Sequence, residues 1–200
     1  DDDTYVIVEN LKQYLASQEI RELDRNNTPL ILGRRYSSPR YRNLAKRPVY
    51  FGNPVNEAFG KRFYSKMNPN GPVIYNYGGS GFAMNWPYIE RFLDIMKSPD
   101  TVHGTPPEDQ AHGVVMAYHG IFPQNTRDQL GRERFHPETP SFMYSMTEEQ
   151  RKIWNENHGA TGGLSIGEEC CSAQSIAFHH VAGSRARSLD HQFYACRRVV

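Results

Sequence analysis

The sequence has no excess of charge of either sign and no long apolar run. Its 23 Lys and Arg residues nearly balance 22 Asp and Glu residues, which gives a formal net charge of +1. This balance offers no electrostatic reason to expect a nucleic-acid or membrane-surface partner. No run approaches the roughly 18 consecutive apolar residues of a membrane span, and no secretory leader is visible. The 200 residues, 12% of them aromatic, suffice for the core of one domain.

Cysteine is also scarce, with three residues in the chain. The odd count leaves at least one thiol that is free, joined to an absent segment, or paired between chains. Cys170 and Cys171 are adjacent, and such a pair either forms a vicinal disulfide or provides two small buried side chains. The segment Asn26-Asn27-Thr28 matches the acceptor pattern for N-glycosylation, which would fit a secretory lumen.

Three consecutive carboxylates, Asp1, Asp2 and Asp3, precede a Thr-Tyr-Val-Ile-Val segment that is typical of a strand running into a helix. We therefore expect hard oxygen ligands on a short turn above a sheet. Mg²⁺ and Mn²⁺ prefer such ligands and keep positions open for phosphate oxygens, and an imidazole in the same shell favours Mn²⁺. Acidic residues at a strand end are also often solvated or cap the next helix, so both interpretations stay open.

The first part of the chain predicts a helix, a strand and a basic loop. Apolar residues at helical spacing predict a surface helix with one apolar stripe: Val8, Leu11, Tyr14 and Leu15. Residues 29–32 predict a short buried strand, which Gly33 ends. A basic, proline-broken stretch follows, from residue 33 to about residue 56, and contains Arg34 and Arg35. It is typical of an exposed loop, with a binding surface as the alternative.

Residues 73–75 predict a strand that leads into the turn Gly78-Gly79-Ser80-Gly81. Glycine lets a ligand approach the backbone or permits a positive φ, so the turn either binds a ligand or is purely structural. It is not a phosphate loop, because the Gly-Lys-Ser/Thr ending is missing. Asn85 then caps a helix with Pro87 in its first turn, and the expected core-facing residues are Ile89, Phe92, Leu93 and Met96.

Two further predicted helix starts are followed by residues that could take part in catalysis or binding. Thr105 and Glu108 predict a capping box, which places Asp109 in the first turn, where the helix dipole favours its charged form. Dipole complementarity alone would explain this position, but a carboxylate held there could also act as a general base. Thr147 and Gln150 predict a second capped helix, which carries Trp154 and ends in a glycine-rich segment.

Near the other end, residues 176–181 predict a strand that carries His179 and His180. Alternation along a strand would point these two imidazoles to opposite faces. A lone His on a strand is usually a satisfied core or surface residue. We also expect His136 to be a hydrogen-bonded structural residue rather than a ligand.

The opening segment, residues 1–11, resembles the aspartate motif of the core 1 β1,3-galactosyltransferases, in glycosyltransferase family 31. The similarity continues in the same order along most of the chain. It is carried by short motifs: Gly33-Arg34-Arg35-Tyr36, Gly78-Gly79-Ser80-Gly81-Phe82, Glu108-Asp109, Phe135-His136-Pro137, Trp154-Asn155, Cys170-Cys171-Ser172 and Phe178-His179.

This resemblance implies an α/β fold of the nucleotide-sugar transferase type called GT-A, of which the chain would form the C-terminal half. Residues 1–200 would be a single, partial catalytic domain. The nucleotide-binding half, a stem and a membrane anchor would lie upstream, and much of residues 37–70 would be a loop insertion. A family disulfide that flanks the Glu-Asp motif would be lost, because Val102 and Val114-Val115 stand in the neighbourhoods of its cysteines.

The resemblance also implies roles for single residues. Asp1, Asp3 and His179 would hold the cofactor Mn²⁺, and Asp109 would be the catalytic base. The donor sugar would be bound by Asp2, Gly79, Ser80, Gly81 and Glu108. Trp154 would belong to the acceptor site, where a flat ring can stack on a sugar.

The implied activity is inverting transfer of galactose from UDP-galactose to the 3-hydroxyl of O-linked N-acetylgalactosamine on glycoproteins. The complete protein would be a type II membrane protein of the Golgi lumen, with a homodimer as a further expectation. A fringe-like β1,3-glycosyltransferase with another UDP-sugar is the nearest alternative. A non-catalytic chaperone or glycan-binding relative is the other, and retention of Asp1, Asp3, Asp109 and His179 argues against it.

Overall fold

A computed structural model gives the fold of residues 2–38, 73–97 and 108–195. The predicted insertion lies almost wholly outside these ranges, and so do Asp1 and the Thr105 end of the predicted capping box. The described residues form a mixed α/β fold, which agrees with the predicted α/β class. The GT-A type stays a prediction. Of the helices in the described ranges, none is long and apolar enough to cross a membrane.

The strands have two to four residues and the α-helices six to eleven. The strands are β1 (Tyr5–Val6), β2 (Ile31–Gly33), β3 (Arg35–Ser38), β4 (Val73–Asn76), β5 (Phe82–Met84), β6 (Phe135–His136) and β7 (Ala177–Phe178). The helices are α1 (Val8–Leu15), α2 (Gln18–Arg25), α4 (Trp86–Met96), α5 (Glu108–Tyr118), α6 (Pro140–Ser145), α7 (Glu148–His158) and α8 (Ser184–Asp190). Single turns complete the set: η2 (Gly78–Ser80), η3 (Gly167–Glu169) and η4 (His191–Ala195).

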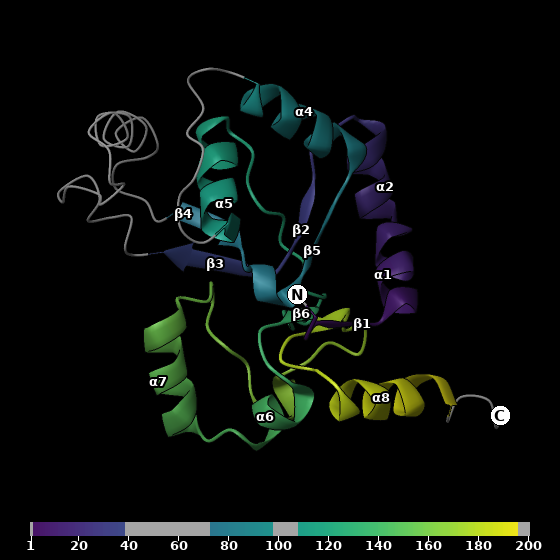
Figure 1. The fold of residues 1–200 in the computed structure, drawn as a ribbon, viewed down its shortest axis with the longest axis vertical. Coiled ribbons are helices and arrows are strands. Elements are labelled where there is room, and N and C mark those ends of the chain that lie inside the picture. The colour runs from purple at the N-terminus through teal and green to yellow at the C-terminus, as the bar shows by residue number, and fades with distance from the viewer. Residues whose placement is uncertain (1, 39–72, 98–107, 196–200) are drawn as a thin grey trace.

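The strands pair into three small sheets in the middle of the molecule (Figure 1). One sheet has the order β1-β7-β6, with β7 antiparallel to β1 and parallel to β6. The other two are the antiparallel pairs β2-β5 and β3-β4. In the view of Figure 1, α1 and α2 lie along one side of these strands, α5 stands on the opposite side next to β4, α4 lies above them, and α6 to α8 lie below them.

The predicted helix starts are confirmed where the structure describes them. The Asn85 side chain caps α4 by accepting a hydrogen bond from the Tyr88 amide, with Pro87 in the first turn. Thr147 and Gln150 form the predicted capping box of α7. Gly159 ends that helix in the left-handed conformation, which costs glycine little because it has no Cβ.

The predicted apolar face of α4 is wrong by about one position. Tyr88 and Ile95 are the buried residues of this helix, and Phe92 packs beside them, whereas Leu93 is 50% exposed. The spacing of apolar residues fits both faces nearly as well, since residues one apart differ by only about 100° around a helix. Packing against Ile31 and Met116 therefore selects the face.

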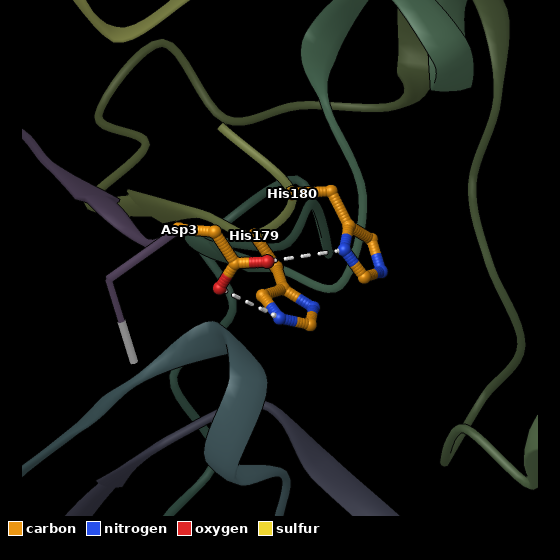
Figure 2. Close-up of side chains that lie close together, drawn as sticks. All are labelled: Asp3, His179 and His180. Carbon is orange, nitrogen blue, oxygen red and sulfur yellow. Dashed lines mark ion pairs between the residues drawn. The ribbon is translucent and has the colours of Figure 1, made fainter. Parts of the chain in front are cut away.

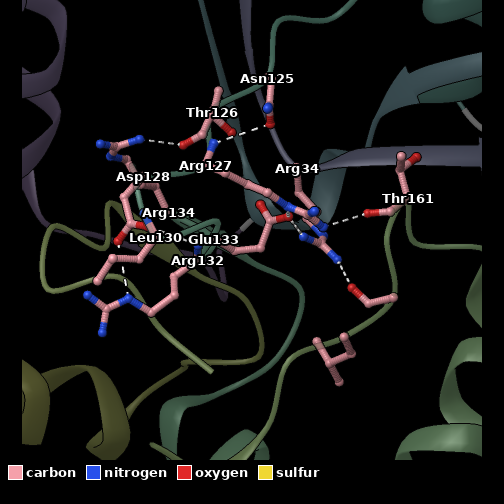
Figure 3. A network of polar contacts seen from close by, with 12 residues as sticks. Arg34, Asn125, Thr126, Arg127, Asp128, Leu130, Arg132, Glu133, Arg134 and Thr161 are labelled. Atoms are coloured by element: carbon pink, nitrogen blue, oxygen red, sulfur yellow. Dashed lines mark hydrogen bonds and ion pairs between the residues drawn. The ribbon is translucent and has the colours of Figure 1, made fainter. Parts of the chain in front are cut away.

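The exposed-loop interpretation of the basic stretch is wrong for its first residues, which belong to β2 and β3. Arg34 is fully buried, forms an ion pair with Glu133, and donates a hydrogen bond to the Gly163 carbonyl. Arg127 pairs with the same carboxylate and donates to the Thr161 carbonyl (Figure 3). Burial lowers the pKa of the Arg34 guanidinium to about 10. This network fastens the glycine-rich segment after α7 to the strands.

The Cys170–Cys171 pair forms a vicinal disulfide in the structure. This outcome decides between the two alternatives that the sequence left open. Cys170 packs in the largest apolar cluster, together with Tyr36, Met143 and Phe178. The disulfide therefore lies in the same apolar cluster as Phe178, the residue that precedes the two adjacent histidines.

Candidate functional site

Strand pairing brings the two ends of the described chain together. β1 pairs with β7 so that Tyr5 lies opposite Phe178 and Val6 opposite Ala177. Continuing this antiparallel register by two residues places Asp3 opposite His180, and the Val181 amide donates to the Asp3 carbonyl. The backbone itself thus holds the aspartate motif against the histidines.

Asp3 and His179 are in direct contact. Oδ1 of Asp3 lies 3.3 Å from Nε2 of His179. The His179 side chain is 9% exposed and the Asp3 side chain 29%. A carboxylate oxygen and an imidazole nitrogen at this separation can share one divalent ion, because metal–ligand bonds of about 2.1 Å put neighbouring ligands roughly 3 to 3.5 Å apart.

The prediction that His180 points to the opposite face is wrong. Nδ1 of His180 lies 3.4 Å from Oδ2 of Asp3, and its ring stacks on that of His179 with centroids 3.7 Å apart (Figure 2). The strand ends at Phe178, and His180 has a positive φ of 58°. Alternation holds only while the backbone stays extended, so this single residue turns its imidazole back toward Asp3.

The glycine turn η2 packs directly against the His179 ring and the aspartate motif. A Cβ on Gly79 would lie 2.5 Å from Cε1 and 2.6 Å from Nδ1 of His179, so only glycine fits there. The Gly79 carbonyl accepts a hydrogen bond from the Thr4 hydroxyl at 2.7 Å, which ties the turn to the aspartate motif. The Tyr77 hydroxyl lies 3.3 Å from Nδ1 of His179. Tyr77 is therefore a positioning residue, since it holds the ring with Nε2 toward Asp3.

Asp109 contacts the first residue of the same turn, next to Gly79. Its Oδ2 accepts a hydrogen bond from the Gly78 amide at 2.9 Å. Asp109 is the second residue of α5, which packs closely on β4: a Cβ on Gly113 would overlap the side chain of Tyr75. The helix and the turn together fix the carboxylate, as the position at the helix start predicted.

The remaining residues predicted to bind the donor sugar differ in their exposure. Asp2 is exposed beside Asp3, and Gly81 has a positive φ of 68° where the chain leaves η2. Ser80 is fully buried, and its hydroxyl has no hydrogen-bond partner among the described residues. Glu108 begins α5, but its side chain lies outside the described structure, and Asp1 lies outside it altogether.

Trp154, the predicted acceptor residue, is buried rather than open to solvent. Its indole is 7% exposed, stacks on His158 at 4.2 Å, and meets the Tyr36 ring edge-on. The indole N–H donates to Oε1 of Glu138 at 3.0 Å. The structure thus connects Trp154 to the site through a second carboxylate, and its role toward an acceptor stays a prediction.

Burial and neighbouring charges favour the neutral forms of the His179 imidazole and the Tyr77 phenol. Burial, and after it the neighbouring His180, lower the pKa of His179, although Asp3 acts in the opposite direction. Burial raises the pKa of Tyr77, and the carboxylates of Glu138, Asp109 and Asp3 raise it further. A neutral imidazole is the form that binds a metal ion.

Sequence reasoning missed four residues of the site: Thr4, Tyr77, Glu138 and His180. Thr4 and Tyr77 each adjoin a motif, but nothing in their own spacing indicates a role. His180 was recognised as part of the strand and assigned the wrong face. Their roles depend on contacts between segments far apart in the sequence.

No protein-family model matches the sequence. A comparison with curated proteins finds a "Glycoprotein-N-acetylgalactosamine 3-beta-galactosyltransferase 1" of Xenopus laevis, 27% identical over 198 residues. This chain is similar to a β1,3-galactosyltransferase. The match covers 98% of the chain and confirms the resemblance inferred from the motifs. The chain spans 44% of the relative's length, which is less than half.

The residues present fit a divalent cation. Asp3, His179 and His180 each offer one ligand atom, and these atoms lie within 4.8 Å of one another. One carboxylate oxygen combined with imidazole nitrogens suits Mn²⁺ and its neighbours in the first transition row better than it suits Mg²⁺ or Ca²⁺.

Proposed function

We propose that this chain is the catalytic part of a metal-dependent, inverting β1,3-galactosyltransferase with a GT-A type fold. Its donor would be UDP-galactose, and its acceptor the 3-hydroxyl of O-linked N-acetylgalactosamine on a glycoprotein. The name of the Xenopus relative supports the sugar and the acceptor class. A type II protein of the Golgi lumen, possessing an anchor outside these residues, fits that activity.

Asp3 and His179 hold Mn²⁺ in this proposal, with Asp1 or Asp2 in support. The ion would supply positive charge for the diphosphate of the donor as the sugar–phosphate bond breaks. Tyr77 keeps the His179 ring in place, and Thr4 keeps the glycine turn against the aspartate motif. The absence of a side chain at Gly79 lets the His179 ring pack against the turn, and its absence at Gly81 leaves room for the donor sugar. Asp2, Ser80 and Glu108 would contribute polar groups around that sugar.

Asp109 is the general base in the same proposal. It takes the proton from the acceptor 3-hydroxyl as that oxygen bonds to the anomeric carbon of galactose. The bond from this carbon to the diphosphate oxygen breaks on the opposite side, UDP leaves with the bonding electrons, and the anomeric configuration inverts. The Gly78 amide holds the carboxylate in position for this step. Trp154 and Glu138 would form part of the acceptor side.

One observation carries this proposal. The turn from Gly78 to Ser80 contacts the base candidate Asp109 through one glycine and the metal-ligand candidate His179 through the next. In this proposal the donor sugar lies over these two neighbouring glycines, with the leaving diphosphate on the side of the cation site and the attacking hydroxyl on the side of Asp109. This division is what a single displacement requires.

The test uses the complete protein with Mn²⁺, UDP-galactose and a peptide that carries N-acetylgalactosamine. Asp109→Asn is expected to lower kcat by about 10² to 10⁴-fold, the range of general-base catalysis, with Mn²⁺ affinity unchanged. Asp94→Asn is the matched control, because Asp94 is an exposed helical carboxylate that forms a surface ion pair with Lys97. Wild-type turnover in Asp109→Asn would refute the base assignment.

A fringe-like transferase with another UDP-sugar uses the same site chemistry. A panel of UDP-sugars and acceptors, assayed with the complete protein, separates the two functions. An inactive wild-type protein that still binds glycans would instead indicate the non-catalytic relative.

A further inference from the structure

His180 lies where a third metal ligand would lie. Its Nδ1 is 3.4 Å from Oδ2 of Asp3, while the other oxygen of that carboxylate is 3.3 Å from Nε2 of His179. Figure 2 shows the carboxylate beside the two stacked imidazoles, with one oxygen directed to each. The three side chains therefore present their donor atoms to one small volume.

The backbone fixes this arrangement independently of any ion. The β1–β7 register places Asp3 opposite His180, and the Val181 amide locks that register through the Asp3 carbonyl. The positive φ of His180 then turns its side chain toward the aspartate instead of away from it. A positive φ is uncommon outside glycine and costs conformational free energy, and residues held in it cluster at functional sites.

The distances agree with shared coordination. Metal–ligand bonds of about 2.0 to 2.2 Å in a tetrahedral or octahedral shell put neighbouring donor atoms roughly 3 to 3.5 Å apart and opposite ones about 4.4 Å apart. All donor atoms here lie within 4.8 Å of one another. His180 is half exposed, so this side of the site remains open for further ligands from a substrate.

A second imidazole changes which ion the site prefers. Imidazole nitrogen binds Mn²⁺, Co²⁺ and Zn²⁺ well, whereas Mg²⁺ prefers an all-oxygen shell. Each added nitrogen therefore widens the gap in affinity between the transition-row ions and Mg²⁺. With Asp3 and His179 alone, the same shell would contain one nitrogen.

We propose that His180 is a third protein ligand, so that Asp3, His179 and His180 form a two-histidine, one-carboxylate site that selects transition-row ions over Mg²⁺. This inference rests on the metal-dependent activity proposed above. It predicts that Mg²⁺ at cellular concentrations does not displace the resident ion. The open positions of the shell remain available for diphosphate oxygens.

The experiment counts metal-bound nitrogens in the complete protein loaded with Mn²⁺ alone. Electron spin echo modulation from ¹⁴N is expected to show two coordinated imidazoles in the wild type and one in His180→Asn. Asn is chosen because it tolerates a positive φ better than most residues. The same variant should bind Mn²⁺ at least about 10-fold more weakly, the lower limit for loss of even an outer-shell partner, and should discriminate less against Mg²⁺. His191→Asn, an exposed His on η4, should change neither.

Two results would overturn the inference, and they differ. One coordinated imidazole in the wild type, kept in His180→Asn and lost in His179→Asn, removes His180 from the shell and leaves the proposed transferase intact. No Mn²⁺ binding by the wild type removes the metal site altogether, and with it the proposed mechanism. Melting curves of the metal-free variants separate either result from misfolding.

Discussion

Replacing Gly79 by alanine should break the cation site by displacing one ring. The new Cβ would lie 2.5 Å from Cε1 of His179 and 2.8 Å from Cε1 of Tyr77, whereas ordinary contacts begin at 3.4 Å. The imidazole or the turn must therefore move by about 1 Å. The ring has little freedom to move, because it meets Tyr77 edge-on and stacks on His180.

Two separate effects are expected from this displacement. Overpacking a well-filled site costs about 1 to 3 kcal/mol of unfolding free energy. A shift of the ring also moves Nε2 of His179 away from its 3.3 Å contact with Asp3 and lengthens its contact with the Tyr77 hydroxyl. Loss of such positioning weakens metal binding by about 10 to 100-fold.

Urea unfolding and Mn²⁺ titration of the complete protein measure these two effects. Gly131→Ala is the matched control, since Gly131 has a positive φ of 77° and no atom within 4 Å of the added Cβ. It should cost about 1 kcal/mol through backbone strain alone and leave Mn²⁺ affinity unchanged. Wild-type Mn²⁺ affinity in a folded Gly79→Ala variant would show that His179 does not need its present position.

Three further predictions concern stability. Glu133→Gln should lower the unfolding free energy by about 3 to 5 kcal/mol in urea titrations, because it leaves the buried Arg34 charge without its partner. Gly113→Ala should destabilise by about 1 to 3 kcal/mol or more and should also lower kcat, because its Cβ would push α5 and its base away from Tyr75. Acid should destabilise through His136, whose pKa burial lowers to about 3. Below about pH 6.5 the imidazole is protonated in the unfolded chain but stays neutral in the folded chain. The unfolding free energy therefore drops by up to about 1.4 kcal/mol per pH unit as the pH falls. His136→Gln should flatten this slope.

Exposed positions serve as controls for these changes. Glu148→Gln removes an exposed partner of Arg151 and should change stability by less than about 1 kcal/mol. Gly120→Ala meets no atom within 4 Å, so only backbone strain should appear. Equal losses in a control and in its core counterpart would refute the packing argument. An acid slope that stays the same in His136→Gln would exclude this residue as its source.

Local elements followed from the sequence because their causes are local. The caps at Asn85 and Thr147 each depend on residues three positions apart, and both formed as predicted. The helix at residues 8–15 formed as its apolar spacing predicted, but Val8 and Leu15 of the predicted apolar stripe are exposed and Tyr14 is buried. His136 is buried and hydrogen-bonded to Ser175, which confirms its expected structural role.

Predictions that depended on the surroundings of a residue were less successful. Leu93 fits an apolar stripe, but the neighbouring strand and helix select the face one residue away. Arg34 lies in a basic stretch, but it is buried because the Glu133 carboxylate, almost a hundred residues later, compensates the desolvation of its charge. His180 obeys alternation only until the backbone leaves the extended conformation.

The sequence by itself determined the α/β class, the helix starts at Asn85 and Thr147, the glycine turn and the similarity to a β1,3-galactosyltransferase. These features depend on spacing within a few residues or on motif order along the chain. The resemblance predicted that Asp3 and His179 share a site. Only the tertiary structure decided that His180 joins them, that Tyr77 holds the imidazole, and that one turn contacts both this cluster and Asp109. The reason is that each of these contacts joins segments that are distant along the chain, and their separation in space is set by strand register and packing, which no local pattern encodes.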